Sequence, residues 1–251
     1  MRSRPLRLLL LLACLLASPA RAAEPELTPL SISVRGQPCS ALLLRPAAAR
    51  ALLVLAHGKL MDIHHPFMEE ISAALARRGV ATLRFNFPYA EAKREQVDPV
   101  PLLAESVRAA TRDAAGRRGS LPLLVGGKSV GALATAFAAQ DGGLPEAQGV
   151  VILSYPLHAP GRPSGLNARA LDGLTLPTLF VQGTRDALAD LTLMTALVEQ
   201  AGKSATLHVV QDGDHAFAPP EGSVRTQQEI YDEIAGAVAS FAATLAPSQG
   251  G

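Results

Sequence analysis

Two kinds of segment alternate along most of this chain: short, continuously apolar runs, and longer runs in which apolar residues recur with a helical period. The apolar runs include ALLVLAH (51–57), LPLLVGG (121–127) and LPTLFVQG (176–183). A strand that is apolar at every position is buried on both faces of its sheet, which is typical of parallel sheets covered by helices. The alternation therefore predicts an α/β fold with a doubly wound, mostly parallel sheet.

The same criteria place the other elements. Before the alternation begins, two runs, LSISVRG and CSALLLRP, predict a short antiparallel hairpin. The stretch at 158–173 lacks periodicity, which predicts a loop or a small cap. No repeat or linker divides the body, so one domain is expected over residues 23–251. Further strands are expected at 80–87, 149–156 and 205–213, and helices at 66–79, 101–119, 130–143, 188–202 and 229–246.

The first 22 residues form a separate unit. MRSRPLR is basic, LLLLLACLLA is apolar, and the segment ends in small residues at Ala20 and Ala22. This order predicts a signal peptide over residues 1–22, cleaved after Ala22, and a secreted or periplasmic protein. The apolar run is short for a membrane span. Lipid attachment at Cys14 is the alternative, although it would leave an unusually short leader.

Charge and cysteine content exclude several classes of protein. Removing residues 1–22 takes four arginines and no acidic residue from a formal net charge of +1, which leaves −3. A mature chain of that charge, with 4% aromatic residues and no tryptophan, is not expected to bind nucleic acid. Cys39 would be the one remaining cysteine, so neither an internal disulfide nor a zinc site is expected. We interpret it as a small buried apolar residue.

Three reactive side chains follow predicted strands, in the order Ser, Asp, His. Ser129 lies in GKSVG after LPLLV, Asp186 follows TLFVQGTR, and His215 follows TLHVVQDGD. The carboxyl ends of parallel strands form the ligand-binding edge of an open α/β sheet. The first segment fits G-x-S-x-G, in which a strained turn between strand and helix exposes the serine, and the order of the three residues is that of an α/β-hydrolase.

The residue types also fit one chemistry. A serine hydroxyl is a weak nucleophile until a histidine accepts its proton, and a carboxylate orients that histidine and stabilises the imidazolium. We therefore predict Ser129 as nucleophile, His215 as general base and Asp186 as the orienting acid. The backbone N–H of Val130 and that of Lys59, with Leu60 as the alternative, would form the oxyanion hole. No cofactor is needed.

The motifs also show a family resemblance. They are, in this order, HGKLMDIHHPFM, RFNFPY, GGKSVG, YPLHAPGRP, PTLFVQGTRD and GDHAF, within residues 50–245. Together they resemble the α/β-hydrolase-like family of testis-expressed protein thirty and the third regulatory subunit of the nonspecific-lethal complex. The resemblance implies the α/β-hydrolase fold with Ser129, Asp186 and His215 at the triad positions, but no particular substrate. In place of the family's usual glycine after His-Gly, this chain has Leu60, whose side chain would crowd an acyl oxygen.

Structural explanations compete with the catalytic ones. Ser129 would otherwise be a turn serine that caps the following helix. Asp186 would otherwise cap the helix that starts near Ala187, which leaves Asp190 as a substitute acid. The adjacent His64 and His65 do not form a convincing metal site. His57 is expected to brace its loop. A further histidine, His158, either lines the cleft or braces a loop.

Two lysines flank the predicted site. Lys59 follows the oxyanion glycine and Lys128 immediately precedes the nucleophile. They would attract an acidic substrate if both side chains reached the cleft, or else pair with acidic groups on the surface.

Two functions fit these observations. The first is a secreted or periplasmic serine hydrolase that cleaves a small acyl ester or a related substrate. The second is a non-catalytic hydrolase fold that serves as a binding module of the cell envelope, which Leu60 and the family's regulatory members favour. Retention of all three triad residue types favours the first. The oligomeric state does not follow from the sequence.

Overall fold

A computed structural model describes residues 23–163 and 167–245, so the predicted signal peptide lies outside the described residues. The strands are β1 (Glu26–Val34), β2 (Gln37–Arg45), β3 (Ala51–Ala56), β4 (Val80–Phe85), β5 (Leu123–Lys128), β6 (Gly149–Leu153), β7 (Thr178–Gly183) and β8 (Ala205–Val210). The helices are α1 (Pro66–Arg77), α2 (Pro88–Glu91), α3 (Val100–Arg117), α4 (Val130–Ala139), α5 (Leu191–Gln200) and α6 (Gln227–Leu245). Short 3₁₀ turns are η1 (Gln140–Gly142), η2 (Ala168–Ala170) and η3 (Gly202–Ser204).

All eight strands form one sheet in the order β1-β2-β4-β3-β5-β6-β7-β8. Strands β3 to β8 are parallel, whereas β1 and β2 pair with each other antiparallel and join the sheet through β4. Every residue of β3 to β7 is buried. The mostly parallel sheet and the antiparallel N-terminal hairpin predicted from the sequence are therefore confirmed.

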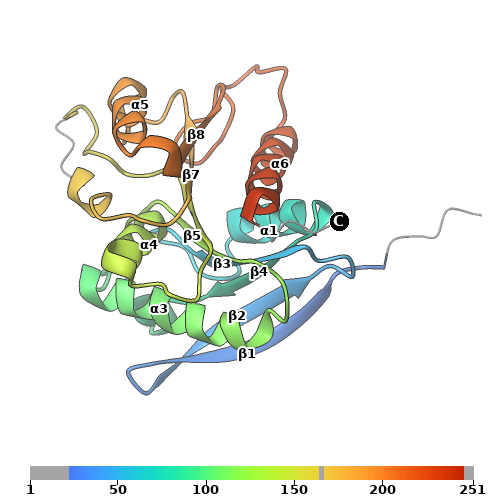
Figure 1. The fold of residues 1–251 in the computed structure, drawn as a ribbon. Coiled ribbons are helices and arrows are strands. Elements are labelled where there is room, and N and C mark those ends of the chain that lie inside the picture. Colours follow the sequence, from blue (N-terminus) through green and yellow to red (C-terminus); the bar gives the residue numbers. More distant parts are fainter. Residues whose placement is uncertain (1–22, 164–166, 246–251) are drawn as a thin grey trace, which may run out of the picture.

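Helices cover both faces of the sheet (Figure 1). The helices α3, α4 and α5 pack on one face, where Val107, Ala134 and Met194 belong to a common apolar cluster. On the other face α1 and α6 pack together through residues such as Met68 and Ile234. Burial on both faces explains why the strands are apolar at every position.

Besides the unpredicted short helix α2 and shifts of a few residues at other element ends, the structure differs from the predicted elements in two places. Strand β1 begins at Glu26 rather than at residue 30, because its first residues pair with the end of β2, where Glu26 lies opposite Arg45. In the predicted loop at 158–173, η2 forms because the Gln140 side-chain amide donates to the carbonyls of Arg169 and Asp172. Both differences depend on contacts distant in sequence, which periodicity does not detect.

Among the described helices, none is both long and apolar enough to cross a lipid bilayer.

Candidate active site

Ser129, His215 and Asp186 meet at the carboxyl edge of the sheet. Ser129 directly follows β5, Asp186 follows β7, and His215 follows β8. The Ser129 hydroxyl lies 2.9 Å from His215 Nε2, and His215 Nδ1 lies 2.8 Å from Asp186 Oδ2 and 3.0 Å from Oδ1. The imidazole therefore bridges the hydroxyl and the carboxylate. Although the three residues are up to 86 positions apart in sequence, the parallel strands bring them together.

The backbone at Ser129 is strained. Its φ and ψ angles are 55° and −116°, a combination that a residue with a side chain rarely adopts. Ser129 stands at the N-cap position of α4, yet its side chain makes no capping hydrogen bond. The capping explanation for this serine is therefore wrong: its hydroxyl is directed to His215 instead.

Close backbone packing on both sides of Ser129 requires glycine. A Cβ on Gly127 would lie 2.4 Å from the carbonyl carbon of Gly131, and one on Gly131 would lie 2.4 Å from the carbonyl oxygen of Ala56. Strand β5, the start of α4 and the end of β3 therefore approach one another more closely than side chains would permit. This packing holds the turn in its sharp conformation.

Asp186 is held by several donors. Its side chain is fully buried. The Gln182 amide donates to Asp186 Oδ2 at 2.5 Å, and the Leu188 N–H donates to Oδ1 at 2.8 Å. Gln182 is fixed in turn, because its side-chain oxygen accepts the Tyr155 N–H. Gln182 was not predicted from the sequence as a site residue, although a polar residue near the end of an apolar strand was an available signal.

The alternative acid, Asp190, does not contact His215. Its Oδ1 accepts the Leu193 N–H at 3.0 Å, which caps α5, and its own N–H donates to His158 Nε2. Asp186 and not Asp190 therefore bonds to the histidine. His158 braces this loop, as one of its two interpretations predicted.

His57, His64 and His65 lie in the segment between β3 and α1. Burial lowers the pKa of His57 to about 4, so the ring is neutral at pH 7 and its Nε2 accepts the Phe87 N–H at 3.2 Å. This bond braces the loop after β3, as predicted. His65 caps α1 by accepting the Phe67 N–H, and His64 faces Glu69.

Cys39 is buried in β2, and burial raises the pKa of its thiol to about 11.

Two backbone N–H groups near Ser129 are free to bind an anion. Within the described ranges, neither Val130 N–H nor Lys59 N–H donates a hydrogen bond. Val130 is the first residue of α4, where amides are unpaired within the helix. The loop of Lys59 lies against the nucleophile, since a Cβ on Gly58 would be 3.6 Å from Ser129 Cβ. Leu60 has a positive φ of 59° and is 70% exposed, so its side chain projects into solvent.

Lys128 does not lie where an acidic substrate would meet it. Only 2% of the residue is exposed, and its Nζ donates to the main-chain oxygen of His215 at 2.8 Å. Neither interpretation of Lys128, contact with an acidic substrate or pairing with a surface acidic group, describes this buried side chain. Because side chains alternate along a strand, Lys128 points into the layer beneath the site.

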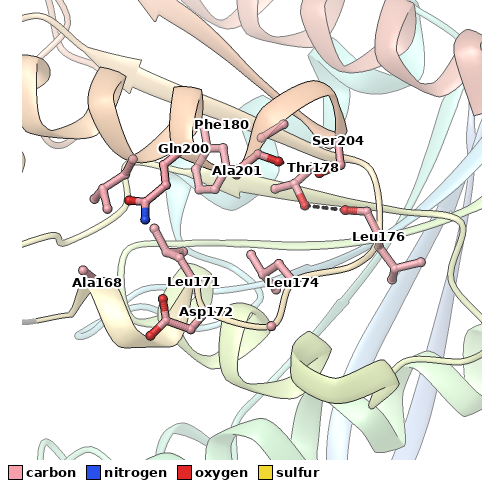
Figure 2. Close-up of a pocket in the computed structure, with 13 residues that line it drawn as sticks. Ala168, Leu171, Asp172, Leu174, Leu176, Thr178, Phe180, Gln200, Ala201 and Ser204 are labelled. Atoms are coloured by element: carbon pink, nitrogen blue, oxygen red, sulfur yellow. Dashed lines mark hydrogen bonds between the residues drawn. The ribbon is translucent and has the colours of Figure 1, made fainter.

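A pocket of about 240 Å³ lies at the opposite edge of the sheet (Figure 2). Its wall includes Thr178 and Ala205, the first residues of β7 and β8, together with Leu171 and Leu174. Asp186 and His215 follow the other ends of the same strands, about 20 Å away for strands of this length. This pocket is therefore separate from the Ser129 site.

The eight-stranded sheet, its strand order and the strained serine turn between β5 and α4 define the α/β-hydrolase class of fold. Residues 49–243 match the family model described as an alpha/beta hydrolase domain. The chain belongs to this family. The narrower resemblance to the family of testis-expressed protein thirty stays a prediction.

Solved structures agree with this fold. A dienelactone hydrolase from Anabaena variabilis matches with a TM-score of 0.71 and 22% identity, over 90% of this chain and 100% of that one. XC6422 from Xanthomonas campestris, described as a serine hydrolase without lid, matches with a TM-score of 0.68 and 19% identity, over 93% of this chain and 100% of that one. Est1E from Butyrivibrio proteoclasticus with bound ferulic acid matches with a TM-score of 0.66 and 18% identity, over 86% of this chain and 98% of that one.

Proposed function

We propose that this protein is an exported serine hydrolase that cleaves a small carboxylic ester or a related activated acyl group. The observation that carries the proposal is the continuous hydrogen-bonded chain from Ser129 through His215 to Asp186. Membership of the alpha/beta hydrolase family and the strained turn at Ser129 support it.

In the proposed reaction, Ser129 Oγ attacks the carbonyl carbon of the ester while His215 Nε2 takes the hydroxyl proton. Asp186 accepts from His215 Nδ1, which fixes the tautomer and stabilises the imidazolium. The carbonyl oxygen becomes an oxyanion between the N–H groups of Val130 and Lys59. As the tetrahedral intermediate collapses, the bond to the leaving alcohol breaks and His215 gives that oxygen its proton. Ser129 is left acylated.

The second half of the reaction uses water in place of the alcohol. His215 takes a proton from the water, whose oxygen attacks the acyl carbon. When the second tetrahedral intermediate collapses, the bond to Ser129 Oγ breaks and His215 returns the proton to the serine. The carboxylic acid leaves, and no cofactor takes part.

The surroundings of Ser129 support the proposed substrate class. The segment between β6 and β7 adds only a short 3₁₀ turn in its described part, rather than a helical cap domain. His215 is 26% exposed through its side chain, so solvent reaches the imidazole. An open site of this kind suits a small or flexible acyl group. The ferulic acid in Est1E and the dienelactone named for the Anabaena enzyme are ligand and substrate of those proteins, and they guide the choice of esters to assay.

Covalent labelling tests the proposal. A fluorophosphonate probe should label the purified protein, because an activated serine attacks phosphorus and is trapped. Labelling should disappear in Ser129→Ala. Thr135→Ala serves as a matched control, because Thr135 is a buried hydroxyl residue within α4 that bonds to Gly131 O. If the folded wild-type protein is not labelled, the binding-module alternative replaces the hydrolase.

Export gives a separate expectation. N-terminal sequencing of the protein from its native host should begin at Ala23, because the basic, apolar and small-residue order of residues 1–22 is that of a cleaved leader. A retained Met1 in the soluble protein would contradict export by this route. A lipid on Cys14 would instead support the lipoprotein alternative.

A further inference from the structure

Lys128 is a buried cation to which the proposed reaction assigns no role. It ends β5 immediately before Ser129, and it faces the apolar layer formed with α1 and α6, where Leu124 also points. Burial of the ammonium lowers the pKa of Lys128 to about 8, although the Asp186 and Asp214 carboxylates oppose this shift. A charge is costly to bury unless it is compensated by specific contacts. The contacts of Lys128 therefore indicate what the residue does.

Those contacts converge on the loop that carries the histidine. Lys128 Nζ donates to the main-chain oxygen of His215 at 2.8 Å and lies 5.2 Å from the centre of the Phe67 ring. The Phe67 ring stacks at 6.4 Å on Phe217, which belongs to the same loop. The ammonium thus lies between the first turn of α1 and the segment after β8.

Two consecutive residues therefore hold His215 from opposite ends. The Ser129 hydroxyl contacts the imidazole, and the Lys128 ammonium contacts the carbonyl of the same residue. We infer that Lys128 is a positioning residue, which fixes the main chain of His215 so that the imidazole stays between Asp186 and Ser129. This inference rests on the proposed hydrolase function.

The other main-chain restraints on this loop act on residues that flank His215, such as the bonds from Asp214 N–H to Ala218 O and from Phe217 N–H to Asp214 O. Asp214 Oδ1 accepts the N–H groups of Ala216 and Ala218, and Phe217 is fully buried. These contacts would keep the loop folded without Lys128. None of them involves the His215 carbonyl, which among the described residues accepts a hydrogen bond from Lys128. Loss of the ammonium should therefore affect the alignment of the histidine more than the fold.

Lys128→Met tests the inference, since methionine fills much of the same space above Phe67 but cannot donate. Assayed at pH 7, where wild-type Lys128 is charged, kcat should fall about 10- to 100-fold, because a misplacement of about 1 Å at a catalytic group has an effect of this size. KM should change less than about twofold. The rate of fluorophosphonate labelling should fall in parallel with kcat.

Thermal unfolding separates positioning from a structural role. Removing the buried ammonium relieves its desolvation cost but leaves the His215 carbonyl without its donor, and because these effects oppose each other Tm should stay close to that of wild type. The folded chain binds the Lys128 proton less tightly than the unfolded chain does, so the cost to stability is fully present below pH 8. This cost disappears as the pH rises from 8 toward 10.5, which is the ordinary pKa of a lysine. Any Tm advantage of Lys128→Met should accordingly shrink across that range.

Arg84→Met is the matched control, because Arg84 in β4 is also a buried cation on the α1 side, and its Nε and Nη1 lack partners within the described chain. Its kcat should stay within about twofold of wild type. Full kcat in Lys128→Met would overturn the inference, and so would a fall in kcat accompanied by a lower Tm. If wild type itself neither hydrolyses esters nor reacts with the probe, the proposed function fails and this inference falls with it. If wild type is active and Lys128→Met gives one of the contradicting results, only the inference about Lys128 fails.

Discussion

Ser129→Ala and His215→Ala should each reduce kcat for ester hydrolysis by about 10⁴- to 10⁶-fold, and the double variant should be scarcely slower than either single one. The reason is that the hydroxyl and the imidazole act as one unit across their 2.9 Å contact, so removing one leaves the other without a partner. Steady-state kinetics on a small chromogenic ester, with circular dichroism as a check of folding, provide the measurement. Losses that multiply in the double variant would contradict a shared mechanism.

The two aspartates provide the internal comparison. Asp186→Asn should cost about 10⁴-fold, because it disturbs the histidine tautomer while the nucleophile and base remain. Asp190→Asn should leave kcat nearly unchanged, since Asp190 caps α5 and does not contact His215. The reverse pattern would show that the acid is wrongly assigned.

Gly131→Ala should destabilise the fold by about 3 kcal/mol or prevent folding altogether. The new Cβ would lie 2.4 Å from the carbonyl oxygen of Ala56 and 2.6 Å from that of His57, so α4 must move away from the end of β3. That shift would also displace Val130 N–H. In thermal unfolding, Tm should fall by about 6–12 °C in a chain of this size.

Gly236→Ala is the control for that change. Gly236 lies within α6, and a Cβ there would meet no atom within 4 Å. Because alanine favours a helix over glycine, this variant should gain about 0.5–1 kcal/mol. Similar losses of Tm at both positions would contradict the close-packing argument for Gly131.

Local pattern was sufficient for much of the fold. Continuously apolar runs such as residues 51–57 and 176–183 correctly predicted buried parallel strands, because burial on both faces leaves a direct mark on every residue of a strand. Local pattern predicted the ends of the strands and helices less accurately. The early start of β1 at Glu26 depends on pairing with Arg45, and such a partner leaves no mark on the sequence around residue 26.

The candidate site divides in the same way. Ser129, Asp186 and His215 could be selected from the sequence, because parallel strands end at one edge and each residue follows such an end. The sequence favoured Asp186 but left Asp190 as an alternative acid, since both are near the same strand end, and the structure shows that Asp186 is the one that bonds to the imidazole. That choice depends on distances of a few ångströms, which a spacing of four residues does not resolve.

The sequence by itself determined the class of fold and the edge of the sheet where reactive groups gather, because both follow from periodicity and strand direction. Only the tertiary structure decided that Gln182 supports Asp186, and that Lys128 turns inward to the His215 carbonyl. A polar side chain next to a motif reads the same in sequence whether it faces solvent or a buried partner. Its direction is set by alternation along the strand and by the helices that close over it.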